Sequence, residues 1–336
     1  MYRYFFCILL IGISCKSPNT VDLTEKPTLF SQQEIIEEAN SYLEKEPITL
    51  TSTICERSAG TPNDFYSEGD YWWPNPADPD GPYMRKDGKT NPENFIAHRL
   101  AMRDLSRWVA SLTAAYKITK DKKYADKALM HLKAWFIHAD TKMSPHLLYA
   151  QAIKGRVTGR GIGIIDTIHL IEVAKSIQVL AALNYLTAPD YKGLKNWFKE
   201  YVTWLITHPY GLKEKDHGNN HSTWWAAQVA AFADLADRPE ILEDCRKQYK
   251  KLLVAQMDKK GGFPDELERT KPYNYSLFNI EGYVILAEIA SIPADNLWNY
   301  QTPNGTLRQA IEFMMPSIKD KRQWTYPKDV QQFDEL

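Results

Sequence analysis

Asn219, Asn220 and His221 follow a glycine-containing loop and precede an apolar stretch that has helical periodicity. Amide and imidazole groups at a helix N-terminus can bind an anion, because the backbone N–H groups there are free and the helix dipole is positive. A second interpretation also fits, in which one Asn caps the helix and His221 is a buried, hydrogen-bonded residue. Taken alone, this triplet indicates either an anion site or a capped helix.

Arg269, Tyr273 and Tyr275 form a second group, between Gly261-Gly262 and the next apolar stretch. A guanidinium beside a tyrosine favours the phenolate and lowers its pKa from about 10, so that the phenolate can act as a base. The alternative is that these residues only pack and form ion pairs. The group therefore predicts a candidate base and leaves two tyrosines open for that role.

The third group combines aromatic rings and cations in one long loop region between about Ile48 and Asn94. Its candidate ligand-binding residues are Tyr71, Trp72, Trp73, Arg85 and Lys89. Aromatic rings stack on sugar faces, and cations form charge-assisted hydrogen bonds with carboxylates. The alternative is a loop that plugs one end of the protein body.

Two motifs that could bind a metal fail on spacing. Counted from Asp78, a calcium loop would place Lys89 at position twelve, where a glutamate is required. His217 and His221 are four residues apart, but Gly218 and two asparagines between them argue against a continuous helix. We therefore predict no metal site and no cofactor.

Carboxylate pairs for glycoside hydrolysis have no distinctive spacing. The candidates are Asp265, Glu266, Glu268 and Glu281. A glycine-rich segment at 155–161 lacks the preceding strand and the Lys-Ser/Thr ending of a phosphate-binding loop. Glycoside hydrolysis stays open as an alternative function.

The rest of the chain predicts an all-α protein, because no strand-like alternation is sustained. After a capped helix that begins at Ser31, we expect helices at 95–118, 122–139, 162–186, 190–207, 220–236, 239–257, 276–291 and 305–317. Short turns join them in pairs, the first helix apolar on most faces and the second amphipathic. About four such hairpins indicate a helical toroid or solenoid, with the cleft among the long connections at 140–161, 208–219 and 258–275.

The N-terminus resembles a bacterial export signal with a lipoprotein processing site. Arg3 precedes a short apolar run at 5–13 that is too short to span a bilayer, and Cys15 follows. We expect residues 1–15 to be a signal peptide, 16–30 a tether and 31–336 a single catalytic domain. The protein would be exported, and periplasmic or anchored through lipid on Cys15. Cys55 and Cys245 are then expected to be packing residues.

Charge and composition exclude several classes of protein. The 336 residues carry 41 Lys+Arg and 42 Asp+Glu, a net charge of -1, and 44% are hydrophobic. These values are typical of a globular protein and not of a disordered one. With no overall positive field, nucleic acid is not an expected partner. We expect a monomer that contacts a membrane only through an N-terminal lipid.

Three segments together resemble the alginate lyase superfamily of polysaccharide lyases. They are 71–95, 218–226 and 263–279, with weaker support from 155–166. The resemblance spans about residues 30–315 and implies an (α/α) toroid, an incomplete barrel of helical hairpins with a long aromatic loop near the N-terminus. The Trp-Trp-Pro-Asn-Pro loop is more similar to the branch in anaerobic gut bacteria, which includes glucuronan and alginate lyases, than to mannuronate lyases.

The resemblance implies roles for individual residues. Asn220 and His221 match the pair that neutralises the uronate carboxylate, and Arg269 matches the arginine beside the catalytic tyrosine. In mannuronate-specific members that tyrosine lies seven residues after the arginine, whereas the candidates here lie four and six after it. We choose Tyr275, because it immediately precedes the expected helix start, and keep Tyr273 in reserve. The expected substrate contacts are Tyr71, Trp72, Trp73, Arg85, Lys89, Arg160, Asn219, Trp224 and Tyr273.

The implied reaction is metal-independent syn β-elimination of a polyuronate, alginate or glucuronan. Neutralising the carboxylate acidifies the C5 proton, and Tyr275 would take that proton and protonate the departing C4 oxygen. Two alternatives remain: an (α/α) glycoside hydrolase that acts on uronate-containing glycans, and a non-catalytic uronan-binding protein.

Overall fold

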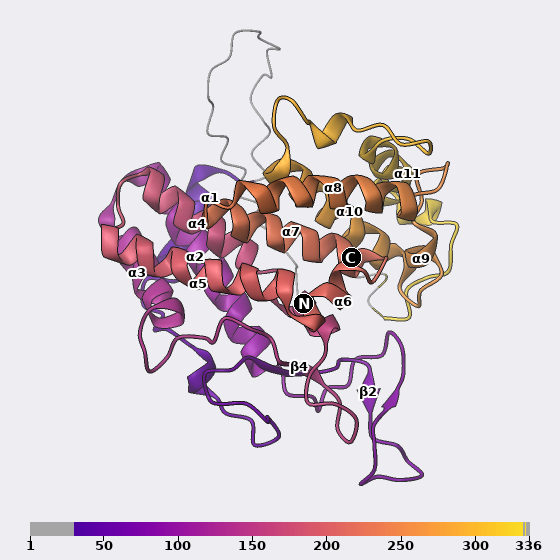
Figure 1. Ribbon diagram of the computed structural model, residues 1–336, viewed down its shortest axis with the longest axis horizontal. Coiled ribbons are helices and arrows are strands. Elements are labelled where there is room, and N and C mark those ends of the chain that lie inside the picture. Colours follow the sequence, from indigo (N-terminus) through magenta and orange to yellow (C-terminus); the bar gives the residue numbers. More distant parts are fainter. Residues whose placement is uncertain (1–29, 332, 334–336) are drawn as a thin grey trace.

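The computed structural model describes residues 30–331 and 333, and most of the longer elements are helices (Figure 1). The α-helices are α1 (Gln32–Asn40), α2 (Ala97–Thr119), α3 (Lys122–Phe136), α4 (Leu170–Ala182), α5 (Ala188–Thr207), α6 (Pro209–Lys215), α7 (Asn220–Leu235), α8 (Pro239–Gln256), α9 (Pro264–Leu267), α10 (Pro272–Ala290) and α11 (Leu307–Lys319). The 3-10 helices are η1 (Leu50–Ser52), η2 (Gly161–Thr167), η3 (Leu297–Asn299) and η4 (Lys321–Gln323).

The helices form hairpins that pack side by side. The hairpins are α2/α3, α4/α5, α7/α8 and α10/α11, and their first helices are neighbours in the order α2, α4, α7, α10. In the described part of the chain, α2 and α10 make no comparably extensive contact with each other. The ring of inner helices is therefore open between α2 and α10, which agrees with the incomplete toroid expected from the sequence.

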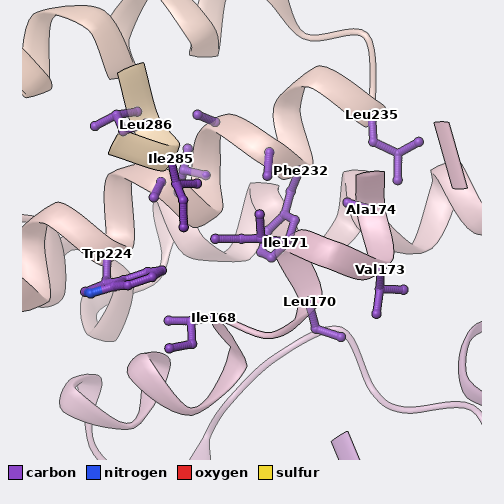
Figure 2. Close-up of a cluster of buried hydrophobic side chains, with 14 of the residues drawn as sticks. Ile168, Leu170, Ile171, Val173, Ala174, Trp224, Phe232, Leu235, Ile285 and Leu286 are labelled. Atoms are coloured by element: carbon purple, nitrogen blue, oxygen red, sulfur yellow. The ribbon is translucent and has the colours of Figure 1, made fainter. Parts of the chain in front are cut away.

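The apolar core lies between the inner helices (Figure 2). Phe232 of α7 lies near Ile171 of α4, and Ile285 and Leu286 of α10 approach from the other side. Almost all of α7 is buried, and its many alanines let neighbouring helices approach closely. Trp224 belongs to this core, because it is fully buried and its Nε1 donates to the Phe278 carbonyl at 2.9 Å.

Two helix starts differ from the prediction by more than two residues. The helix expected at 162–186 begins as η2, and its α-helical part starts only at Leu170. Gly161 and Gly163 of η2 lie against other backbone, where a Cβ would come within 2.8 Å of the Tyr210 carbonyl oxygen and 2.7 Å of the Ala150 carbonyl carbon. The helix expected from Ser276 starts at Pro272, because proline is favoured in the first helical turn.

Short strands organise the segments that were expected to be loop. β1 (Tyr66–Glu68) pairs in parallel with β4 (Tyr149–Ala152), and β2 (Trp72–Trp73) pairs antiparallel with β3 (Met84–Arg85). The β2–β3 hairpin extends away from the helices at the lower right of Figure 1. The strands thus fix the aromatic loop beside the segment that carries Gln151.

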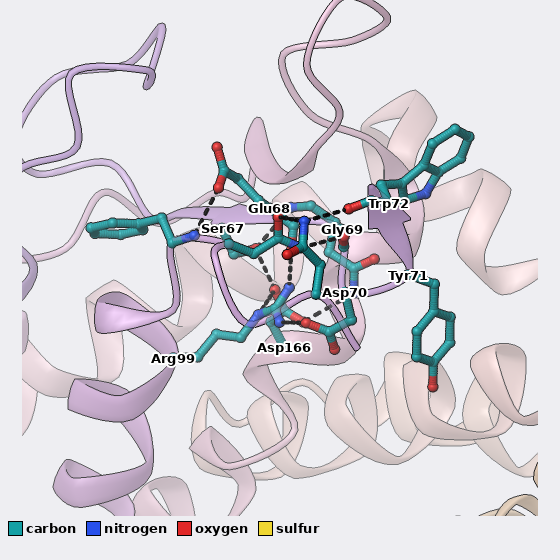
Figure 3. A network of polar contacts seen from close by, with 12 residues as sticks. Ser67, Glu68, Gly69, Asp70, Tyr71, Trp72, Arg99 and Asp166 are labelled. Atoms are coloured by element: carbon teal, nitrogen blue, oxygen red, sulfur yellow. Dashed lines mark hydrogen bonds and ion pairs between the residues drawn. The ribbon is translucent and has the colours of Figure 1, made fainter. Parts of the chain in front are cut away.

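A buried arginine ties this loop to the helices (Figure 3). Arg99 of α2 is 5% exposed, and its Nε donates to Asp166 Oδ2 at 2.9 Å. Its Nη2 donates to the Glu68 carbonyl at 2.6 Å, and its Nη1 contacts Asp70. Ser67 Oγ donates to the same Asp166 oxygen at 2.5 Å. The backbone that leads to Tyr71 and Trp72 is therefore held by one ionic cluster.

Three further predictions concern the N-terminus, the cysteines and membrane contact. Cys15, the signal peptide and all of the tether except Phe30 lie outside the described residues. Cys55 and Cys245 are buried free thiols, as expected of packing residues. Within residues 30–331 and 333, no helix combines the length and apolar character needed to cross a membrane.

Replacing Arg99 with methionine should lower the free energy of unfolding by about 3–5 kcal/mol, because Asp166 would stay buried without its cation. Denaturant unfolding measures this change. Arg308→Met is the matched control, because Arg308 pairs with Glu312 but its side chain is 82% exposed, and its stability should match the wild type. Equal stability of both variants would show that the cluster does not hold the loop.

Candidate active site

A cavity of about 1320 Å³ opens where the inner ring is incomplete. Its walls come from α2, η2, α10, the start of α7 and the aromatic loop. Among its lining residues, those from the sequence prediction are Tyr71, Trp72, Arg85, Arg160, Asn219, Asn220, His221, Arg269 and Tyr275. The long connections thus meet at one cavity, as the hairpin pattern indicated.

The start of α7 presents Asn220 and His221 to this cavity. Asn219 is the N-cap, and its Oδ1 accepts from the His221 N–H at 3.1 Å. Gly218 precedes it with a φ of +98°, a conformation that a residue with a Cβ rarely adopts. The cap predicted for this helix is therefore confirmed, and the two residues that follow it line the cavity, where the anion site stays a prediction.

Asn220 is held by a buried carboxylate. Glu266 of α9 is 1% exposed, and its two oxygens accept from the backbone N–H and the Nδ2 of Asn220, each at 2.7 Å. Burial raises the pKa of Glu266, and the hydrogen bonds from Asn220 oppose that shift. The orientation of the Asn220 amide is fixed by this pair of contacts.

His221 is held by a second buried carboxylate. Glu214 of α6 is also 1% exposed, and its Oε1 lies 2.5 Å from Nδ1 of His221. A carboxylate accepts, so Nδ1 carries a proton and Nε2 is the ring nitrogen left for a ligand. Glu214 therefore sets both the ring orientation and the tautomer of His221.

His217 lies beside this pair and does not complete a metal site. Its ring centroid is 4.8 Å from that of His221, and burial, followed by the His221 charge, lowers the pKa of His217. Among the residues that the structure describes, no group of three or more His, Cys, Asp or Glu side chains is arranged to hold a metal ion.

Tyr275 is the fourth residue of α10 and also lines the cavity. Its hydroxyl is 2.7 Å from the Tyr71 hydroxyl and accepts from Arg269 Nη2 at 3.2 Å. The guanidinium carbon of Arg269 also lies 4.3 Å from the centre of the Tyr275 ring. One hydroxyl thus has two polar partners, one from the aromatic loop and one from the segment before α10.

The expectation that the arginine lowers the pKa of Tyr275 is wrong in its net direction. Burial raises this pKa, and Arg269 and the Tyr71 hydroxyl reduce the increase without reversing it. The phenolate is therefore favoured by its neighbours but disfavoured by the loss of solvent. The net effect is a Tyr275 pKa above its usual value.

Asp87 connects the aromatic loop with Arg269. Its Oδ1 lies 2.5 Å from Arg85 Nη2 and 3.3 Å from Arg269 Nη2, and its Oδ2 accepts from Thr270 Oγ1 at 2.9 Å. Against the effect of burial, the hydrogen bond from Thr270 and the charges of Arg269 and Arg85 hold the pKa of Asp87 below its usual value. Arg269 is consequently fixed between a carboxylate and the ring of Tyr275.

Four predicted substrate contacts lie outside the cavity lining. Tyr273 is 3% exposed and packs against Trp324, because two residues along a helix turn a side chain by about 200° from Tyr275. Trp224 belongs to the core described above. Trp73 donates from Nε1 to the Lys89 carbonyl at 2.9 Å, and neither residue reaches the cavity.

The sequence analysis missed other lining residues. They include Arg99, Arg103, Gln151, Asp166, His169, Lys271 and Gln331. Asp166 ends the 155–166 segment, but nothing in its spacing indicated that it meets Arg99 and Gln151. Glu281 was considered only as one of several acids, and burial raises its pKa to about 7.

Glu281 predicts a pH dependence of stability. Between about pH 4.5 and 7 the Glu281 carboxyl binds more protons in the folded protein than in the unfolded chain, so its contribution to the free energy of unfolding should fall as pH rises, by on the order of 1–3 kcal/mol. Glu281→Gln should remove this loss, whereas Glu243→Gln, at an exposed position of α8, should keep it. Denaturant unfolding at pH 4.5 and pH 8 tests this, and equal slopes in all three proteins would contradict it.

Comparisons with known proteins agree with this architecture. The profile of the Alginate lyase family matches residues 49–324. An alginate lyase from Pseudomonas syringae pv. syringae is 29% identical over 136 residues, and one from Cobetia marina is 27% identical over 128 residues. These matches cover 39% and 38% of this chain, and about a third of each relative's length, at 34% and 33%.

Solved structures match over more of the chain. The crystal structure of an alginate lyase from Bacteroides ovatus has a TM-score of 0.84 and 32% identity, and the match covers 90% of this chain and 81% of that one. Alginate lyase A1-III from Sphingomonas species A1, at 17% identity and a TM-score of 0.58 with the same coverage, shows the same fold. From the family profile and the Bacteroides ovatus structure, we conclude that this chain belongs to the alginate lyase family.

Proposed function

We propose that the protein is a polysaccharide lyase that cleaves a polyuronate by syn β-elimination, with Tyr275 as both base and acid. One observation carries this proposal. The Tyr275 hydroxyl is held by Arg269 and Tyr71 in the same cavity that Asn220 and His221 line. A base and a set of carboxylate-binding donors are the two components that elimination from a uronate requires.

The donors would neutralise the uronate carboxylate. When the C5 proton leaves, negative charge develops on that carboxylate in an enolate-like state, and donors placed in advance stabilise it. Asn220 supplies a donor from the start of α7, where the helix dipole also favours an anion, and His221 would donate from Nε2 in its protonated form. Glu214 supports His221 in this role because it accepts from Nδ1 and leaves Nε2 for the ligand.

Tyr275 would act at both ends of the bond change. In β-D-mannuronate and β-D-glucuronate, the C5 proton and the C4 oxygen lie on the same side of the ring, so one group can reach both. The phenolate takes the C5 proton, the C4–O4 bond breaks as the C4–C5 double bond forms, and the phenol then protonates O4. The Tyr71 hydroxyl and Arg269 would stabilise the phenolate form.

The names of the relatives favour alginate as the substrate of this chain. Glucuronan is the second polymer to test. The family profile and the similar proteins bear the name alginate lyase, and A1-III has been solved in complex with a tetrasaccharide. Because the match spans only about a third of the curated relatives, the activity and its substrate are proposals for this chain.

Glycoside hydrolysis is the second candidate, and Glu281 is the observation that favours it. This carboxyl lines the cavity, and burial raises its pKa to about 7, a value suited to a general acid. Hydrolysis would require Glu281 and a second carboxylate, and it would not depend on Tyr275.

We also propose that residues 1–15 direct export and that Cys15 carries a lipid, which would place the enzyme in the periplasm or on the bacterial envelope. Incorporation of a labelled fatty acid tests this in wild type and Cys15→Ser. Label in the wild type alone supports lipidation, and unlabelled wild type rejects it.

Tyr275→Phe should reduce kcat by roughly a hundredfold to ten-thousandfold while polymer binding persists, because only the proton-transferring hydroxyl is removed. Ultraviolet absorbance of the unsaturated product measures turnover on polymannuronate, polyguluronate and glucuronan, with a chelator present throughout. Tyr273→Phe is the matched control two residues away and should keep wild-type turnover. Full activity in Tyr275→Phe with loss in Tyr273→Phe would reverse the assignment.

His221→Ala should lower kcat/KM by about a hundredfold or more, because a donor to the developing charge is lost. His208→Ala, at the half-buried start of α6, serves as the histidine control and should retain turnover. The same absorbance assay measures both variants. Wild-type kcat/KM in His221→Ala would remove this residue from the proposed mechanism.

A further inference from the structure

Three cations outside the cavity are each placed against an aromatic ring. Lys86 lies 4.9 Å from the Trp73 ring centre, Lys154 lies 5.7 Å from that of Tyr83, and the Arg156 guanidinium lies 5.1 Å from that of Trp72. Lys154 and Arg156 are exposed and Lys86 is half-buried, and none of the three lines the cavity. We call these cations, with the β2–β3 hairpin and the 153–157 loop that carry them, the basic arm.

Hydrogen bonds join the two segments of the basic arm. The Tyr83 N–H donates to the Lys154 carbonyl at 3.1 Å, and Arg156 Nε donates to the Tyr83 carbonyl at 2.7 Å. The Lys86 N–H donates to the Tyr71 carbonyl at 2.7 Å. Segments about seventy residues apart in sequence therefore form one unit that carries the cations together.

The cations of the arm are not neutralised by the rest of the protein. Within residues 30–331 and 333, Lys86, Lys154 and Arg156 form no ion pair with a carboxylate. The 153–160 segment contains three cations and no acid. The acids of the hairpin are Asp78 and Asp80 in its turn and Asp87, which already pairs with Arg85 and Arg269.

The arm is continuous with the cavity wall. Trp72 lines the cavity, and its ring lies 5.1 Å from the Arg156 guanidinium and 5.9 Å from that of Arg160. Arg160 lines the cavity as well, whereas Arg156 lies outside it. A bound polymer that leaves the cavity along Trp72 would therefore meet Arg156 next.

We propose that the basic arm is a second binding surface for a long acidic polysaccharide, and that it holds uronate units of the chain that extend beyond the cavity. This inference rests on the proposed function for the chemical class of the ligand. The rings hold the cations in place before binding, which reduces the ordering cost of contacting a flexible polyanion. The three cations outnumber Asp78 and Asp80, and the positive charge that remains increases the rate at which an anionic polysaccharide arrives.

The test is the chain-length dependence of Lys86→Ala/Lys154→Ala/Arg156→Ala. This variant should lose on the order of tenfold in kcat/KM on a long polymannuronate at low salt and keep wild-type kcat/KM on a tetrasaccharide. Added salt should reduce the difference, because it screens exposed charges. The matched control replaces three exposed lysines of the outer helices α3 and α5, in Lys122→Ala/Lys192→Ala/Lys199→Ala, and should match the wild type on both substrates.

Equal kcat/KM of wild type and arm variant on the long polymer, or an equal loss on both lengths, would overturn the inference. A second measurement, migration through a native gel that contains polymannuronate, tells failure of the arm inference from failure of the proposed lyase function. If the wild type forms no unsaturated product but is retarded in the gel, and the arm variant is not, the arm binds and the lyase proposal fails. If the wild type forms product while both proteins migrate alike, the arm inference fails alone.

Discussion

Two buried carboxylates hold the first turn of α7, and the rest of the site depends on that turn. Glu214 and Glu266 are almost completely inaccessible, and burying a carboxylate without partners would be strongly unfavourable. Their partners are the side chains of His221 and Asn220, together with a backbone N–H of α7. The residues that stabilise the fold at this point are therefore the same ones that face the cavity, and a ligand meets donors whose positions are already fixed.

The helical periodicity predicted most of the inner and outer helices, and the chemical types of a few residues predicted where the site would form. The α7 sequence, apolar on most faces, indicated an inner helix, and the Asn-Asn-His triplet at its start indicated donors at a helix N-terminus. Long connections indicated where a cleft would form. These features are local, because periodicity and capping are encoded within a few turns of one helix.

Contacts between distant segments could not be predicted in the same way. The ion pairs of Arg99 with Asp166 and of His221 with Glu214 depend on how the helices pack, and no spacing in one sequence reports them.

The choice between Tyr273 and Tyr275 shows where prediction from the sequence stops. The helix was expected to start at Ser276, but Pro272 starts it one turn earlier, so both tyrosines lie on α10 and only helical rotation separates them. Tyr273 turns into the core, and Tyr275 turns towards Tyr71.

The mass balance of cleavage tests the central claim most directly. A purified polyuronate oligosaccharide of defined length is treated with the enzyme, and the masses of the two fragments are added. Elimination adds no water, so the account predicts that the fragment masses sum to the mass of the parent and that one fragment is unsaturated. A sum that exceeds the parent by the mass of one water, with both fragments saturated, would show hydrolysis and contradict the role assigned to Tyr275.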